Sequence, residues 1–146
     1  MLITNHVLAG ASIGLLSRSP TVAAASGLLS HFAMDALPHW GICDHRTYVR
    51  TAIVDGAIGI GLSVAVVSAS PPAHRTNVLS GILGACFPDT DQAAVLIFGR
   101  TYQPAWFDRV HAGVQNEHDW LGQEPIVALA LAGVFTWVLR RTRRRG

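Results

Sequence analysis

The sequence predicts an all-α protein, an integral membrane bundle of about five short or broken transmembrane helices. Half of the 146 residues are apolar and only 14% are charged, well below the roughly 25% that is typical of a soluble domain. Short polar breaks containing proline or arginine divide the apolar residues into five runs. The length allows one domain, which we expect to cover residues 1–140, with a basic cytoplasmic tail at 141–146.

The first two apolar runs are rich in small residues. The first covers residues 3–16, and the second begins at Pro20, a residue favoured at the first position of a helix, and ends where Pro38 follows Leu37. Small residues suit close contact between helices in lipid. No basic residue precedes the first run, so we expect it to remain in the mature protein rather than to be removed as a signal peptide.

The later runs differ in length. The third covers residues 51–69, the fourth covers 78–87 and resumes over 93–98 after Pro88, and the fifth ends at Leu139. A membrane-spanning helix needs about 20 apolar residues, which only the third and fifth runs approach. We therefore expect the other three to be short or broken helices packed against their neighbours. A soluble helical bundle with an alanine-rich core is the alternative.

The charged residues separate once the five runs are arranged up and down, as short connections require. All nine carboxylates and six of the seven histidines then fall at one end, whereas Arg18, Arg75 and the five arginines of the tail fall at the other. The positive-inside rule places the arginine end in the cytoplasm. We expect a multi-pass protein of the bacterial inner (plasma) membrane with a cytoplasmic C-terminus. The grouping of arginines at one end also argues against binding of nucleic acid.

The sharpest local pattern is a histidine and an aspartate four residues apart, His31 and Asp35, which share one face of a helix. Two ligands at this spacing can hold one metal ion. Ionisable residues inside a membrane are rare and costly, so their default interpretation is functional. The alternative is that the two side chains only pair with each other.

Other polar residues at the same end extend this candidate site. Taken alone, His6 is typical of a solvated helix end, Asp89 of a turn and His111 of an interfacial helix. Together with His31 and Asp35, these three residues could bind zinc or another first-row divalent ion. Asp55 and Asp91 are candidate catalytic bases, or alternatively outer supports or ligands of a second ion. The predicted metal ligands are His6, His31, Asp35, His39, Asp89 and His111, with His39 either an outer support or a ligand of a second ion.

Four segments carry a resemblance to a known family. They are Thr4-Asn5-His6, residues 29–40, Phe87-Pro88-Asp89 and residues 107–115. The chain resembles small bacterial membrane proteins similar to the predicted membrane-bound metal-dependent hydrolases, whose His-x-x-x-Asp motif is similar to that of zinc-dependent phospholipase C. The resemblance covers most of the chain. It implies a metal site built on His31 and Asp35, and a phosphoester or lipid substrate.

Three functions follow from these observations. The first is a metal-dependent hydrolase at the extracytoplasmic face that acts on a phosphoester or a lipid headgroup, with membrane lipid as its partner. The second is a carrier or proton relay that uses the same residues. The third is a non-catalytic protein in which the metal only joins helix ends. Cys43 and Cys86 are consistent either with a disulfide between them or with two separate small apolar side chains in the packing.

Overall fold

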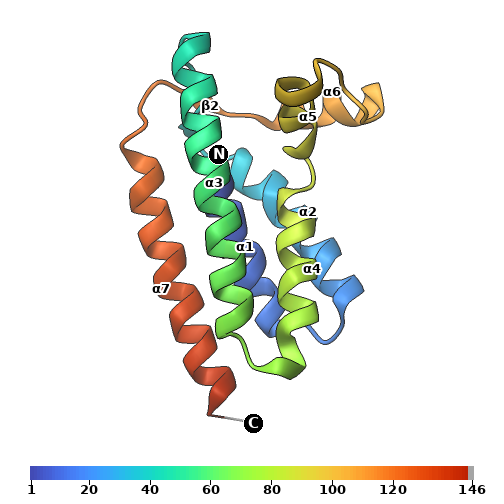
Figure 1. Cartoon of the computed structure of the whole chain (residues 1–146), viewed down its shortest axis with the longest axis vertical. Helices are drawn as coiled ribbons and strands as arrows, with labels where there is room; N and C mark the ends of the chain where they lie inside the picture. Colours follow the sequence, from blue (N-terminus) through green and yellow to red (C-terminus); the bar gives the residue numbers. More distant parts are fainter. Residues whose placement is uncertain (145–146) are drawn as a thin grey trace.

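The computed structural model describes residues 1–144 and confirms an all-helical chain. Five longer helices form an antiparallel bundle, and two short helices lie beside one end of it (Figure 1). The two residues of the predicted tail that follow Arg144 lie outside the described part. In chain order the elements are α1 (Ile3–Leu16), α2 (Pro20–Asp35), β1 (His39–Trp40), α3 (His45–Ala69), the 3-10 turn η1 (Pro72–His74), α4 (Arg75–Cys86), α5 (Thr90–Phe98), α6 (Ala105–Val114), β2 (Glu117–His118) and α7 (Gln123–Arg143).

Local chemistry explains where the helices begin and end. Ser19 accepts a hydrogen bond from the backbone N–H of Val22, and Pro20 occupies the first position of α2. Asp44 caps α3, and hydrogen bonds from Thr47 hold the pKa of its carboxyl below the usual value. The expected break at Pro88 is confirmed, because α4 ends at Cys86 and α5 begins at Thr90.

Helices α1, α2 and α4 pack with their backbones nearly in contact, as their small residues predicted. A Cβ atom placed on Gly10 of α1 would lie 2.5 Å from the carbonyl oxygen of Gly81 in α4. A Cβ on Gly27 of α2 would overlap the same oxygen, and one on Gly84 would overlap the carbonyl oxygen of Ala24. Glycine is therefore required at these crossings, since any side chain would separate the three helices.

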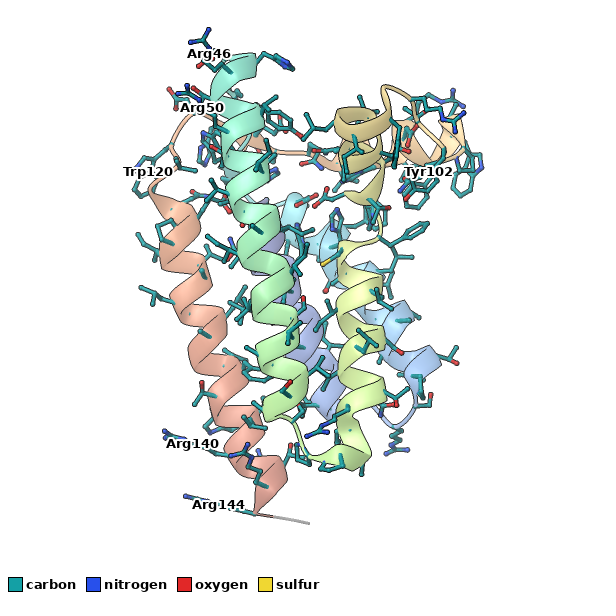
Figure 2. The ribbon with its side chains drawn as sticks, in the orientation of Figure 1. Arg46, Arg50, Tyr102, Trp120, Arg140 and Arg144 are labelled. Atoms are coloured by element: carbon teal, nitrogen blue, oxygen red, sulfur yellow. The ribbon has the colours of Figure 1, made fainter. Side chains whose placement is uncertain are left out.

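The apolar core occupies the lower half of the bundle, between α1, α3, α4 and α7. Its buried members are Val7, Ala11, Leu15, Val66, Val78, Ile82, Phe135 and Val138. Arg140 and Arg144 lie at one end of the bundle, and Arg46, Arg50, Tyr102 and Trp120 lie at the other (Figure 2).

Two helices of the described residues, α3 and α7, are long and apolar enough to cross a membrane by themselves. This is fewer than the five spans that the sequence predicts, because α1, α2 and α4 contain only 14, 16 and 12 residues. Only 17% of the most apolar stretch of α3, and the same share of α7, is buried inside the molecule. Large side chains such as Ile60 and Leu129 are 72% and 75% exposed.

Candidate metal centre

Five of the six predicted metal ligands converge at the upper end of the bundle. His31 and Asp35 lie on the last turns of α2, His6 lies on the second turn of α1, Asp89 lies in the turn between α4 and α5, and His111 lies on α6. All except Asp89 are buried, and the side chain of Asp89 is 17% exposed. Residues separated by up to 105 positions are thus brought to one point.

Four of these residues lie close enough to share one metal ion. One donor atom from each of His31, Asp35, Asp89 and His111 lies within 4.8 Å of the other three. His31 Nε2 is 3.0 Å from Asp35 Oδ2 and 3.8 Å from Asp89 Oδ1, and His111 Nε2 is 3.3 Å and 3.7 Å from the same two oxygens. Ligands of a tetrahedral ion with bonds of about 2.0–2.1 Å lie about 3.3–3.4 Å apart, so these spacings suit a coordination shell.

The ring of His31 is held in the orientation that a metal ligand needs. Its Nδ1 lies 2.7 Å from the carbonyl oxygen of Ala85 in α4. Because a carbonyl only accepts, Nδ1 carries the proton and Nε2 presents its lone pair to the cluster. An imidazole fixed by a backbone carbonyl on one nitrogen is the usual arrangement of a metal-binding histidine.

His6 supplies a second indication of a metal. Its ring is 0% exposed and is stacked on the ring of His31, with 4.1 Å between the ring centroids. Its Nε2 lies 3.2 Å from Asp35 Oδ1 and 3.9 Å from Asp89 Oδ2, yet neither ring nitrogen forms a hydrogen bond. A buried polar atom without a hydrogen bond is costly, and a cation between His6 Nε2 and the two carboxylates would remove that cost for Nε2.

His39 lies outside the cluster, so its prediction as a direct ligand needs correction. Its Nδ1 lies 2.9 Å from the carbonyl oxygen of Leu37, and its Nε2 lies 2.7 Å from Oε1 of Gln115. Both ring nitrogens are therefore occupied. Gln115 in turn donates from Nε2 to Asp35 Oδ2 at 2.8 Å, so His39 supports the cluster through this amide.

Asp55 and Asp91, the two predicted catalytic bases, instead accept hydrogen bonds from backbone N–H groups. Asp55 of α3 accepts hydrogen bonds from the N–H groups of Ile3 and Thr4 at the beginning of α1, at 2.6 and 3.3 Å. It thereby fixes the helix that carries His6. Asp91 accepts from the N–H groups of Tyr102 and Gln103 at 2.8 and 3.1 Å, which folds the loop before α6. Neither carboxylate forms a contact with the cluster, and the geometry gives each a positioning role.

Helix α6 is held beside the cluster by contacts with α2 and with the segment that follows α2. The N–H of Asn116 donates to the carbonyl oxygen of Asp35 at 3.0 Å, and β1 pairs with β2 in parallel, with His39 opposite Glu117. Phe107 of α6 packs edge-on against Phe32 of α2, with 5.9 Å between ring centroids. These contacts place His111 above the histidine and aspartate of α2.

The sequence did not single out Glu124, which is 1% exposed at the beginning of α7. Its carboxylate accepts hydrogen bonds from the N–H of Leu2 at 3.0 Å, from the Asn5 amide at 2.8 Å and from the N–H of Trp40 at 3.0 Å. This joins α7, α1 and β1. An acidic residue before a proline in a first helical turn ordinarily indicates only an interaction with the helix dipole.

A pocket of about 300 Å³ adjoins the cluster, between the beginning of α1, α3 and α5. Asp89 and Gln115 belong to its wall, and apolar side chains such as Ile3, Trp40 and Leu96 form most of the remainder. Arginine is absent from this wall. Cys86 also lines the pocket; it and Cys43 are both free thiols, without a disulfide between them.

No protein-family model, curated protein or solved structure matches this chain. The resemblance to membrane-bound metal-dependent hydrolases therefore rests on the sequence motifs alone and stays a prediction.

Proposed function

We propose that this protein is a membrane-embedded, metal-dependent hydrolase that acts on a phosphoester or a lipid headgroup at the extracytoplasmic face. The observation that carries the proposal is the convergence of His31, Asp35, Asp89 and His111 within 4.8 Å. The buried ring of His6, which forms no hydrogen bond and has its Nε2 3.2 Å from Asp35 Oδ1, supports it. Mixed imidazole and carboxylate donors suit zinc first among the divalent ions.

The residues around the cluster have separate tasks in this proposal. A divalent ion held here supplies Lewis acidity toward a phosphoryl oxygen. The carbonyl of Ala85 keeps the His31 lone pair directed inward, and Gln115 holds Asp35 while its own oxygen faces His39. Asp89 is the most exposed of the donors and also faces the pocket, so substrate reaches the cluster from its side.

The pocket supports a substrate with an apolar part. Its wall is mainly apolar, and its acidic members Asp55, Asp89 and Glu117 are not balanced by any arginine. Besides the metal, a phosphate group in this pocket would find as counter-charge, among the described residues, only the Met1 amino group, which is already paired with Asp35. An amphipathic ester therefore fits better than a polyanion, as expected for a lipid headgroup with its acyl chains.

The surface of the molecule supports a place in the membrane. The apolar stretches of α3 and α7 are long enough to span and are largely exposed, whereas the core helix of a soluble protein is mostly buried. Contiguous exposed apolar surface of this kind marks contact with lipid or with a partner protein. We propose that the shorter helices α1, α2 and α4 lie in the bilayer beside them, and that the arginine-rich end of α7 faces the cytoplasm.

The carrier hypothesis receives less support. A pathway for ions or protons requires polar groups that continue from the cluster toward the other end. Below His6, the buried space is filled by apolar side chains of α1, α3, α4 and α7. The non-catalytic alternative, in which the metal only joins helix ends, uses the same donors as the hydrolase. Only a measurement of activity distinguishes the two.

The test is hydrolysis by purified protein in lipid vesicles, with a chromogenic phosphodiester and with a headgroup-labelled phospholipid as substrates. We expect turnover that is lost with a chelator, restored by Zn²⁺ and absent from His111→Ala. His45→Ala is the matched control, because His45 is exposed at the same end and lies outside the cluster. Metal-loaded protein without turnover on either substrate would leave only the structural role.

A further inference from the structure

Each carboxylate of the cluster has one oxygen near His31 and His111 and its other oxygen near His6. Oδ2 of Asp35 lies 3.0 Å from His31 Nε2 and 3.3 Å from His111 Nε2, while its Oδ1 lies 3.2 Å from His6 Nε2. Asp89 repeats the pattern: Oδ1 faces His31 and His111 at 3.8 and 3.7 Å, and Oδ2 faces His6 at 3.9 Å. Each carboxylate thus divides its oxygens between the same two groups of imidazoles.

We propose that this centre is dinuclear, with two divalent ions bridged by Asp35 and Asp89. This rests on the proposed function, which requires only one ion. The first ion takes His31, His111, Asp35 Oδ2 and Asp89 Oδ1. The second takes His6, Asp35 Oδ1 and Asp89 Oδ2. Bridged pairs of ions about 3.5–4 Å apart recur in phosphatases and nucleases.

The environment of His6 is the independent observation that requires the second ion. The first four donors account for one ion completely and leave His6 unused. His6 is fully buried, forms no hydrogen bond from either nitrogen and lies nearest the two oxygens that the first ion does not take. Asp35 Oδ1 also accepts a hydrogen bond from the Met1 amino group at 2.9 Å, so this oxygen already faces a positive charge.

The donor counts give the two ions different roles. Four protein donors form the closed set of a structural zinc site, whereas three leave a position open for water or substrate, as in catalytic sites. Asp89, which bridges the two ions, and Met1, whose amino group binds Asp35 Oδ1, line the pocket, whereas none of the three histidines does. A substrate in the pocket therefore reaches the centre at Asp89, and the open position on the ion at His6 is the one available to it.

The experiment is a titration of the detergent-purified protein with Mn²⁺, with bound ion counted and its electron paramagnetic resonance spectrum recorded. We expect two ions per chain with the spectrum of an exchange-coupled pair. His6→Asn, whose polar side chain is too short to place a donor where Nε2 lies, is expected to bind one ion with an uncoupled six-line spectrum. His45→Ala is the control and is expected to keep two.

Two results would overturn the dinuclear centre: a single uncoupled ion in the unaltered protein, or two coupled ions in His6→Asn. Circular dichroism of each variant shows that it remains helical, and His6→Ala repeats the measurement with a smaller side chain. Failure of the proposed function is measured separately, in the turnover assay, since a non-catalytic protein would bind its ions without hydrolysing either substrate.

Discussion

At the scale of single residues, Asp35 organises the site. Its carboxylate lies within 3.3 Å of three imidazoles and accepts a hydrogen bond from Gln115, and its backbone carbonyl accepts one from Asn116. The same residue therefore binds the ion and positions the segment that delivers His111. The Nε2 lone pair of His31 faces this carboxylate, so a divalent ion between the two would replace a repulsive contact by two metal bonds.

A substitution of Gln115 tests whether the hydrogen bonds around the metal ligands hold them in position. Gln115→Ala removes the amide that links Asp35 to His39, and loss of such an outer partner typically weakens metal affinity 10–100-fold. We expect a loss of about that size in a competition titration with a fluorescent zinc chelator, at unchanged ion count when zinc is saturating. An affinity equal to that of the unaltered protein would show that Gln115 does not position the ligands.

A substitution of Glu124 tests whether its hydrogen bonds join α7 to α1 and β1. Glu124→Ala leaves the N–H groups of Leu2 and Trp40 and the amide of Asn5 without their acceptor, which should cost about 3 kcal/mol of unfolding free energy. Reversible denaturation in detergent measures this. Glu117→Ala is the matched control, since that exposed carboxylate accepts no hydrogen bond among the described residues, and an equal loss in both variants would contradict the assigned role.

At the scale of elements, the close crossing of α1 and α4 carries His6 toward Asp89. Gly81→Ala places a methyl group on the backbone carbonyl of Gly10, and overpacking of this kind costs about 1–3 kcal/mol. We expect a lower midpoint of thermal unfolding together with weaker metal binding. Gly61→Ala on α3 is the control, because its new Cβ has open space around it. Equal midpoints for the two variants would contradict backbone contact between α1 and α4.

The elements also show how much the sequence could predict. Proline and polar breaks marked the ends of the helices well: α4 ends one residue before the end of the predicted run at 87, and α5 begins three residues before the predicted restart at 93. The His31 and Asp35 pair was found because a helix places residues four apart on one face. The sequence offered His39 as an outer support, but the group that it supports and the roles of Asp55 and Glu124 could not be found in this way, because their partners lie on other elements and depend on how those elements pack.

At the scale of the whole molecule, the metal should contribute to stability as well as to chemistry. Ions that bind only the folded chain stabilise it by about 4 kcal/mol when the free ion is 1,000 times its dissociation constant. We expect a chelator to lower the midpoint of thermal unfolding, and added Zn²⁺ to restore it. Asp35→Asn should show no such response. An unaltered midpoint after verified removal of the metal would contradict this coupling between the ion and the fold.

The separation of charge along the bundle predicts its orientation. Arg140 and Arg144 lie at the end opposite Arg46 and Arg50 (Figure 2), but the α7 end also carries Arg141 and Arg143, so the positive-inside rule predicts that the α7 end is cytoplasmic. Reporter fusions should therefore be active in the cytoplasm after residue 144 and outside it between residues 100 and 120. A cytoplasmic position for the loop from 100 to 120 would place the cluster on the wrong side for the proposed substrate.

The most direct measurement of the central claim is the zinc content of the detergent-purified protein, measured by mass spectrometry beside His31→Ala, Asp35→Ala and the control His45→Ala. We predict stoichiometric zinc in the unaltered protein and in His45→Ala, and a loss of at least one ion per chain in the other two variants. Zinc that survives both substitutions in the cluster, or an unaltered protein that binds none when zinc is supplied, would contradict the account.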